Sequence, residues 1–313
     1  MAHPAKWISA TGDEPVTAVA TRSLQSRLQP VQELLPLAAK KYQDDIEYVH
    51  HLRVWTRRAD AAIEMYRDLL PDWRAAWIEE QLARIRKATN DARDADVFAR
   101  RLERDDAPAA KSLLKDVRKY RREVQPLVTD IFARMNKKKG RFGRRVEKLL
   151  KRVRLRGKRR KSKEPTYRVW AEFQLRPILA EFFEMATSDL KDTEQLHQFR
   201  IVGKKLRYAL ELLGAAFGSE LRKETYPQLE KLQAHLGTIN DHASAIERIR
   251  HWIDECEDAE QSKYLREMLK RERDRLAESR RRFNTWWTTS RCAHLRKSFE
   301  ASLGENCTAR KTA

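Results

Sequence analysis

The sequence predicts an all-helical protein. Glycine and proline number only 9 and 10 among 313 residues, whereas a sheet-rich fold of this length needs many tight turns built from those two residues. Charged residues make up 36% of the chain and hydrophobic residues 41%, a balance typical of helices that bury one apolar stripe and expose their other faces. The chain is long enough to enclose a sizeable core.

Two classes of protein are disfavoured by the same sequence. The first twenty residues contain no apolar run of the length of a signal peptide or a membrane span. The cysteines, Cys256, Cys292 and Cys307, are odd in number and form no CxxC pair, so neither a disulfide framework nor a structural zinc site is expected. We therefore expect a protein of the reducing cytoplasm without a membrane partner.

The net charge is the strongest compositional signal. Lys and Arg total 66 against 46 Asp and Glu, which gives a formal charge of +20. A field of this sign attracts polyanions such as nucleic acid, an anionic membrane or polyphosphate. Composition alone does not choose among them.

Much of this charge is concentrated in residues 137–163, where sixteen Lys and Arg accompany a single acid, Glu147. Apolar residues recur there at helical spacing, which predicts an amphipathic helix docked by its apolar stripe. That stripe consists of Phe142, Val146, Leu149, Leu150 and Val153. For residues 156–163 the composition leaves both an ordered helix end and a disordered linker open.

On either side of this segment the sequence repeats itself. VHHLRVWTRRADAAIEMY starting at Val49 matches LHQFRIVGKKLRYALELL starting at Leu196, and NDARDADV matches GTINDHAS further along each half. His50 and His197 are 147 positions apart, as are Asp94 and Asp241. One constant offset across two separate motifs predicts a duplicated half-domain, each half a bundle of about four helices.

The repeated motif carries a basic face beside its apolar stripe. At about 100° per residue, one face of the second copy holds His197, Arg200, Lys204 and Arg207, and the matching face of the first copy holds His50, Arg53 and Arg57. Among the i+4 positions, where an acid would neutralise these charges, the only acid is Glu211, which follows Arg207. Isolated solvated charges and a hydrogen-bonded boundary histidine are the ordinary interpretation of such residues, but their recurrence favours a binding surface.

Several neighbouring residues modify that surface. Asp60 stands where Arg207 stands in the other copy, which weakens the first face. Asp94 and Asp241 would repel a polyanion, so we expect them to cap a helix or orient a neighbouring cation. Arg93, next to Asp94, is a further candidate phosphate contact.

These motifs resemble those of the CHAD family, the conserved histidine α-helical domain. The resemblance rests on HHLRVWTRR with NDARDADV and on HQFRIVGKKLRY with LGTINDHA, and it covers roughly residues 17–282. It implies two pseudo-symmetric helical bundles around a basic central groove, and binding of inorganic polyphosphate by basic residues and histidines. Thr89 and Asn90 replace the Leu-Gly pair of the family pattern in the first copy.

The expected organisation follows from the repeat and the resemblance. Residues 17–290 would form the CHAD domain, with helical halves 17–135 and 165–290 joined by a basic helical segment 136–164. Residues 1–16 and 291–313 would be terminal tails. Association with cytoplasmic polyphosphate granules is a further expectation, and the oligomeric state is left open.

The function we expect is non-enzymatic polyphosphate binding, without a metal or another cofactor. The candidate contacts are His50, Arg53, Arg57, Arg58, Arg93, His197, Arg200, Lys204, Lys205, Arg207, Arg141, Arg145 and Lys148. Protonation of the two histidines near pH 6 would add charge to the groove.

Two alternative functions remain. A non-specific nucleic-acid binder fits the charge, but the basic segment contains one aromatic residue, Phe142, and it lies on the docking stripe. Single-strand binders interleave basic and aromatic residues. A metal-dependent polyphosphate-processing enzyme would need an acidic cluster that the motifs do not supply, so no catalytic residue is expected.

Overall fold

The computed structural model describes residues 6–159 and 164–303, and over these residues the chain is helical, which confirms the predicted fold class. No strand occurs among them, and the only β-type pairing there is a single bridge between Pro15 and Thr166. The helices of the first half and the connection are α1 (Val16–Lys40), α2 (Glu47–Met65), α3 (Asp72–Ala88), α4 (Asn90–Leu102), α5 (Pro108–Glu123) and α6 (Gln125–Arg159). Those that follow are α7 (Tyr167–Met185), α8 (Thr193–Leu213), α9 (Tyr226–Asp254), α10 (Ala259–Trp286) and α11 (Thr289–Leu303).

Short-range signals fix several helix starts. The side chain of Asp192 accepts a hydrogen bond from the backbone N–H of Gln195 at 2.9 Å and caps α8, and Asp258 caps α10 through Gln261 at 2.8 Å. Such caps satisfy amide groups that the first helical turn leaves unpaired. Pro108 occupies the first turn of α5, where its missing N–H costs nothing.

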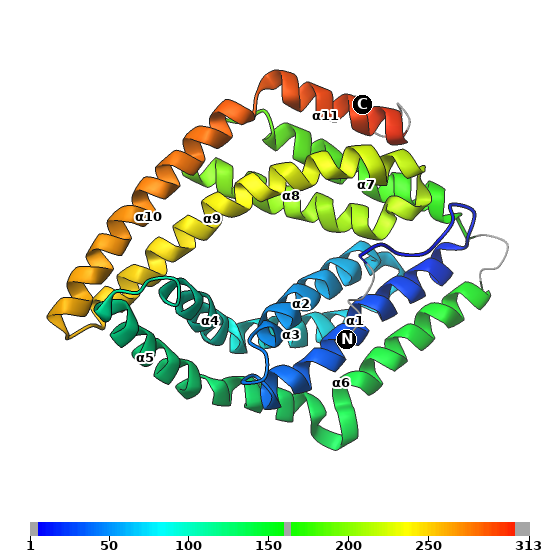
Figure 1. Cartoon of the computed structure of the whole chain (residues 1–313). Helices are drawn as coiled ribbons and strands as arrows, with labels where there is room; N and C mark the ends of the chain where they lie inside the picture. Colours follow the sequence, from blue (N-terminus) through cyan, green and yellow to red (C-terminus); the bar gives the residue numbers. More distant parts are fainter. Residues whose placement is uncertain (1–5, 160–163, 304–313) are drawn as a thin grey trace.

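The two halves meet in one large core. Figure 1 shows α1 and α2 side by side in the lower half, α7, α8 and α9 in the upper half, and α2 facing α8 across the junction. Side chains such as Leu24 of α1, Leu52 of α2 and Leu210 of α8 are fully buried in this core. Burial of this apolar surface is the main force that holds the halves together.

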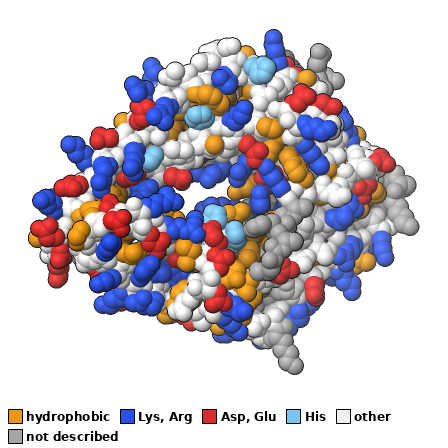
Figure 2. Space-filling view, viewed as in Figure 1, with side chains coloured by type: hydrophobic (Ala, Val, Ile, Leu, Met, Phe, Trp, Pro, Cys, Tyr) orange, Lys and Arg blue, Asp and Glu red, His pale blue; other side chains and the backbone are white. Residues whose placement is uncertain are grey.

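A second, smaller core lies at the other end of the molecule. It joins α4 and α5 to α9 and α10 through buried side chains that include Phe98, Val117, Ile249 and Leu265. The halves are therefore in contact at two places. Between these places Figure 2 shows an opening in the surface, with many Lys and Arg side chains around it.

The basic segment forms the outer helix α6, as its apolar stripe predicted. Phe142, Val146, Leu149, Leu150 and Val153 are all buried, where α6 packs on α1 and α3. The helix begins at Gln125, twelve residues before the basic run, and Gly140 with a φ of 82° lies at a bend in it. Residues 156–159 are helical, and 160–163 lie outside the described residues.

The expected boundary of the C-terminal tail is wrong for residues 291–303. They belong to helix α11, and Cys292, Leu295, Phe299 and Leu303 are buried in the large core. These positions follow one another at three- and four-residue steps, the spacing of a single helix face. Part of the expected N-terminal tail is also packed, since Ile8 is only 4% exposed and Trp7 lies against the large core.

The helix order of the two halves agrees in part. Shifting α2 by 147 positions gives residues 194–212, and α8 spans 193–213. The first half, however, divides into α3 and α4 where the second half continues as the single helix α9. The duplication itself stays a prediction.

Candidate anion-binding groove

The junction of α2 and α8 is anchored by a buried carboxylate. Glu211 of α8 is 1% exposed and accepts a hydrogen bond from Arg58 Nε of α2 at 3.1 Å. The hydroxyl of Tyr226 donates to the same carboxylate at 2.9 Å. A buried charge is tolerated only with such partners, so Glu211 fixes the relative position of the two helices that carry the repeated motif.

Arg57 of α2 lies close enough to α8 to act on its cations. Burial first, and the positive charge of Arg57 second, lower the pKa of Arg200. The pKa of Lys204 falls to about 8, through burial and then through the charges of Arg200 and Arg57. Like charges at the surface normally lie apart, so this convergence creates a site of high positive potential. The basic faces of the two motifs thus meet, although they are far apart in sequence.

The first-half side of the site is built around Arg53. Its Nη1 donates to the Arg86 carbonyl at 2.5 Å and to Thr89 Oγ1 at 3.0 Å. Burial, followed by the charge of Arg57, lowers the pKa of Arg53 to about 10. The hydrogen bonds hold its guanidinium against the end of α3, so its charge has a defined position.

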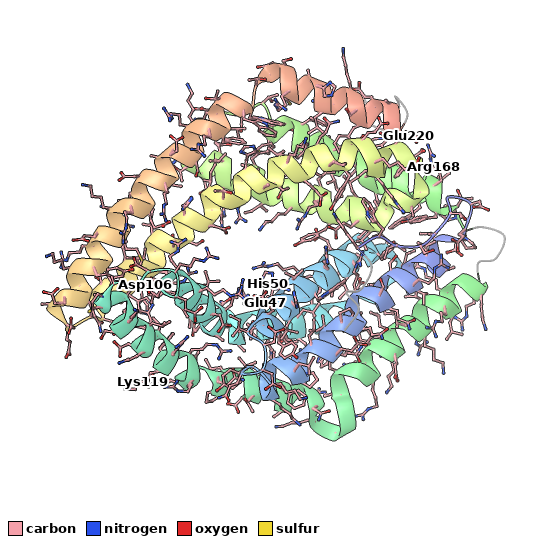
Figure 3. All side chains as sticks on the ribbon, in the orientation of Figure 1. Glu47, His50, Asp106, Lys119, Arg168 and Glu220 are labelled. Atoms are coloured by element: carbon pink, nitrogen blue, oxygen red, sulfur yellow. The ribbon has the colours of Figure 1, made fainter. Side chains whose placement is uncertain are left out.

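His50 and Arg93 extend this side. Burial, and next the charge of Arg93, lower the pKa of His50 to about 4, so the ring is neutral at pH 7. Arg93 Nη1 is 3.9 Å from the carboxylate of Glu47. Figure 3 shows His50 and Glu47 together on α2 at the edge of the central opening.

The second-half side continues along α8. The guanidinium of Arg207 lies 5.0 Å from the ring of Tyr208. Burial acts to lower the pKa of Arg207, but Tyr208 and Glu211 outweigh it and the pKa is raised. His197 is exposed one turn before Arg200, on the helix face that the spacing predicts.

Several guanidinium nitrogens of the site have no protein acceptor within the described part of the chain. They are Arg86 Nη1, Arg93 Nη1, Arg200 Nε, Arg207 Nε and Arg248 Nε, all buried. A buried donor without an acceptor is costly, and an anionic oxygen is the acceptor that guanidinium groups favour. Arg86 and Arg248 were not predicted from the sequence, because neither belongs to the repeated motif.

Five of the thirteen candidate contacts are placed elsewhere or already paired. Arg58 is held by Glu211, as described above, and Lys205 pairs with Glu181 of α7 at 2.9 Å. Arg141, Arg145 and Lys148 lie on α6, which packs on α1 and α3 rather than on α8. The candidates that remain for the groove are His50, Arg53, Arg57, Arg93, His197, Arg200, Lys204 and Arg207.

The aspartates near the groove orient cations. Asp94 accepts a hydrogen bond from Arg248 of α9 at 2.7 Å, which confirms the orienting role expected for it and links α4 to α9. Asp60 is neutralised by Arg86 at 3.0 Å. Asp241 acts against the lowering of the pKa of Arg200 and Lys204.

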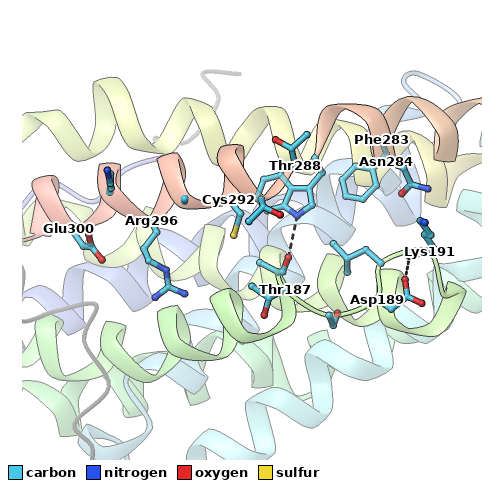
Figure 4. A pocket seen from close by; sticks show the side chains of 16 residues that line it. Thr187, Asp189, Lys191, Phe283, Asn284, Thr288, Cys292, Arg296 and Glu300 are labelled. Carbon is cyan, nitrogen blue, oxygen red and sulfur yellow. Dashed lines mark hydrogen bonds between the residues drawn. The ribbon is translucent and has the colours of Figure 1, made fainter.

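A separate cavity of about 590 Å³ lies between the α7–α8 turn, the end of α10 and α11 (Figure 4). Phe283, Trp287, Cys292 and Arg296 are among its lining residues, and Trp287 Nε1 donates to the Ala186 carbonyl at 3.4 Å. None of the groove residues lines it.

Over residues 6–159 and 164–303, no group of three or more His, Cys, Asp or Glu side chains is arranged to hold a metal ion. Nor does any helix there have the length and apolarity needed to cross a membrane.

The chain is thus an all-helical protein in which cationic side chains of α2 and α8 gather where these two helices meet. The family model described as the CHAD domain matches residues 22–250. The chain belongs to the CHAD family.

Two solved structures share this fold. The crystal structure of the CHAD domain from the plant Ricinus communis is 19% identical, with a TM-score of 0.66 over 90% of this chain and 97% of that one. PptA from Streptomyces chartreusis is 15% identical, with a TM-score of 0.52 over 88% and 99% of the respective chains. No curated protein gave a significant sequence match.

Proposed function

We propose that this protein binds inorganic polyphosphate in the groove between α2 and α8, without catalysing a reaction on it. The observation that carries the proposal is the convergence of Arg57 with Arg200 and Lys204 from the other half of the chain. Membership of the CHAD family, which is associated with polyphosphate binding, supports it.

The chemistry of the ligand fits this arrangement. Polyphosphate carries about one negative charge per phosphate and presents non-bridging oxygens along its whole length, so its affinity should be electrostatic and multivalent. Arg93, Arg200 and Arg207 each have a buried donor nitrogen without a protein acceptor. Phosphate oxygens would satisfy these donors, with Arg acting as a directional partner.

A binding role is favoured over hydrolysis by the character of the groove side chains. Phosphoryl chemistry with Mg²⁺ relies on carboxylate ligands near the reacting phosphate. Asp60, Asp94 and Glu47 are each within ion-pair distance of an arginine, and Asp241 acts electrostatically on Arg200 and Lys204. Their charges are used to position cations.

A competition experiment tests the proposal. Labelled long-chain polyphosphate bound to the protein would be displaced by unlabelled polyphosphate, RNA or DNA at matched phosphate concentration. We expect polyphosphate to compete best, and Arg57→Ala to weaken its binding about tenfold, within the range for a charged hydrogen bond. Lys205→Ala, on the same helix α8 but paired with Glu181 of α7, is the matched control and should bind as the wild type does.

Two results would contradict the proposal. Equal competition by RNA and polyphosphate would leave only non-specific polyanion binding. Release of phosphate from polyphosphate by the wild-type protein with Mg²⁺ or Mn²⁺, abolished by Arg57→Ala, would show that the groove is catalytic.

A further inference from the structure

The outer helix α6 and the start of α3 together form a surface that combines cations with the exposed ring of Trp73 and the partly buried ring of Trp77. The guanidinium of Arg145 lies 4.5 Å from the centre of the Trp77 ring and 6.0 Å from that of Trp73. Arg141 lies 5.5 Å from the Trp77 ring, and Arg74 lies 4.1 Å from the Trp73 ring. From the sequence, the basic segment lacked aromatic neighbours, but the tertiary structure supplies them from α3.

Trp73 is poorly covered for a tryptophan. It is 59% exposed in the first turn of α3, whereas Trp55 in the groove helix α2 is 5% exposed. Leaving a large aromatic ring in water forgoes the stabilisation of its burial. An exposed aromatic ring beside cations can stack on a planar aromatic group of a ligand while the cations bind an adjacent anion.

The surface beside Trp77 is concave and basic. A cavity of about 190 Å³ opens beside Trp77 and is lined also by Arg84, Arg134 and Arg141. Its one acidic residue, Glu80, is paired with Arg84 at 2.6 Å. Further along α6, Lys148, Lys151 and Arg152 are exposed.

This surface is distinct from the groove. Helix α1 packs against α2 on one side and α6 on another, so α1 lies between the groove helix and the basic helix. In Figure 1, α6 runs along the outer edge of the molecule, away from α8.

We propose that the Trp73–Trp77–Arg141–Arg145 surface of α3 and α6 binds single-stranded nucleic acid. The exposed Trp73 ring would stack an unpaired base, and the arginines and the exposed cations of α6 would contact the phosphates. Polyphosphate has no base to stack, and a duplex hides its bases, so a single strand is the polyanion that uses both features. The proposal does not rest on the function of the groove.

The test compares ligands that differ only in their bases. Binding of a single-stranded oligothymidylate would be measured against a deoxyribose-phosphate oligomer of the same length without bases, with the full-length protein. We expect Trp73→Ala to weaken oligothymidylate binding about tenfold, as base–aromatic stacking does elsewhere. Binding of the abasic oligomer and of polyphosphate should be unchanged, and Trp73→Phe should retain most of the affinity.

Phe173→Ala provides the matched control. Phe173 is an aromatic residue of α7 that is 73% exposed. Its substitution by Ala should leave the binding of both oligomers unchanged. Equal weakening of both oligomers by Trp73→Ala, or no change with either, would overturn the proposal. Because Trp73 is exposed, an unchanged thermal unfolding midpoint would confirm that the variant is folded. Loss of polyphosphate binding in a groove variant with oligothymidylate binding intact would separate the two sites.

Discussion

Lys204 is the groove residue whose charge is poised to change near neutral pH. Its pKa falls to about 8, through burial and the charges of Arg200, Arg57 and Arg207, with Asp241 opposing them. A lysine whose pKa is depressed loses its proton as the pH rises through that value. In the free protein it is therefore mainly charged at pH 7 and mainly neutral at pH 9.

We expect polyphosphate affinity to fall by up to about tenfold between pH 7 and pH 9, because one pKa unit corresponds to a tenfold change. Lys204→Arg should flatten this dependence, since arginine stays charged over the range. Fluorescence anisotropy at constant ionic strength would measure both, with Lys205→Arg as the control. A wild-type affinity that is independent of pH would show that Lys204 does not contact the ligand.

The histidine expectation is revised by burial. From its unperturbed pKa of about 6.5, His50 would gain a proton near pH 6, but burial and Arg93 lower its pKa to about 4. We therefore expect His50→Gln to show the same change of affinity as the wild type between pH 8 and pH 6. A rise in affinity at pH 6 that occurs in the wild type and not in the variant would contradict this. It would show that the bound ligand raises the pKa of His50.

At the scale of single elements, the core residues and the candidate binding residues of α8 lie on different faces of the helix. Leu206 is fully buried on the stripe that faces the core, whereas Arg200 and Lys204 lie on the neighbouring basic face. The period of an α-helix makes these faces independent of one another. A substitution on one face should therefore affect one property.

Leu206→Ala should cost about 2–5 kcal/mol of unfolding free energy, because it removes buried methyl groups and leaves a cavity. Arg200→Ala with Lys204→Ala should change the unfolding free energy much less. Urea denaturation of both variants would measure the difference. If the double variant were destabilised as strongly as Leu206→Ala, Arg200 and Lys204 would be needed for folding. A loss of binding in that variant could then not be assigned to lost ligand contacts.

At the scale of the whole molecule, the net charge of +20 raises the question of whether binding is local or diffuse. For a single-stranded polyanion, the logarithm of affinity falls with the logarithm of salt concentration by roughly 0.7 per phosphate neutralised. If binding is local, the salt dependence of the affinity should become shallower only when cations of the site itself are removed. A diffuse field should respond to any two charges equally.

Arg200→Ala with Lys204→Ala should make the polyphosphate salt slope shallower by about one to two units. Lys151→Ala with Arg152→Ala removes the same net charge from exposed positions on α6 and should leave that slope unchanged. Affinities measured over a series of salt concentrations give both slopes. Equal changes in the two double variants would indicate diffuse binding in place of a groove.

The sequence by itself determined the helical class, the core stripes of α2, α6 and α8, and the basic face of the repeated motif. These follow from the 3.6-residue period and from composition, which act over a few turns of chain. It also predicted the family through paired motifs at a fixed offset, which the family match confirms. The apolar spacing of α11 carries the same signal, and the expectation of a tail over residues 291–303 is wrong because that spacing forms a buried helix face.

Only the tertiary structure decided which charges act together. Arg58 and Lys205 belong to the same motif as Arg57 and Lys204, yet Glu211 and Glu181 pair with the first two. Arg86 of α3 and Arg248 of α9 join the groove from outside the repeated motifs, and Trp73 and Trp77 reach the basic helix from α3. Electrostatic energy and burial depend on distances through space, and the packing of distant helices sets these distances.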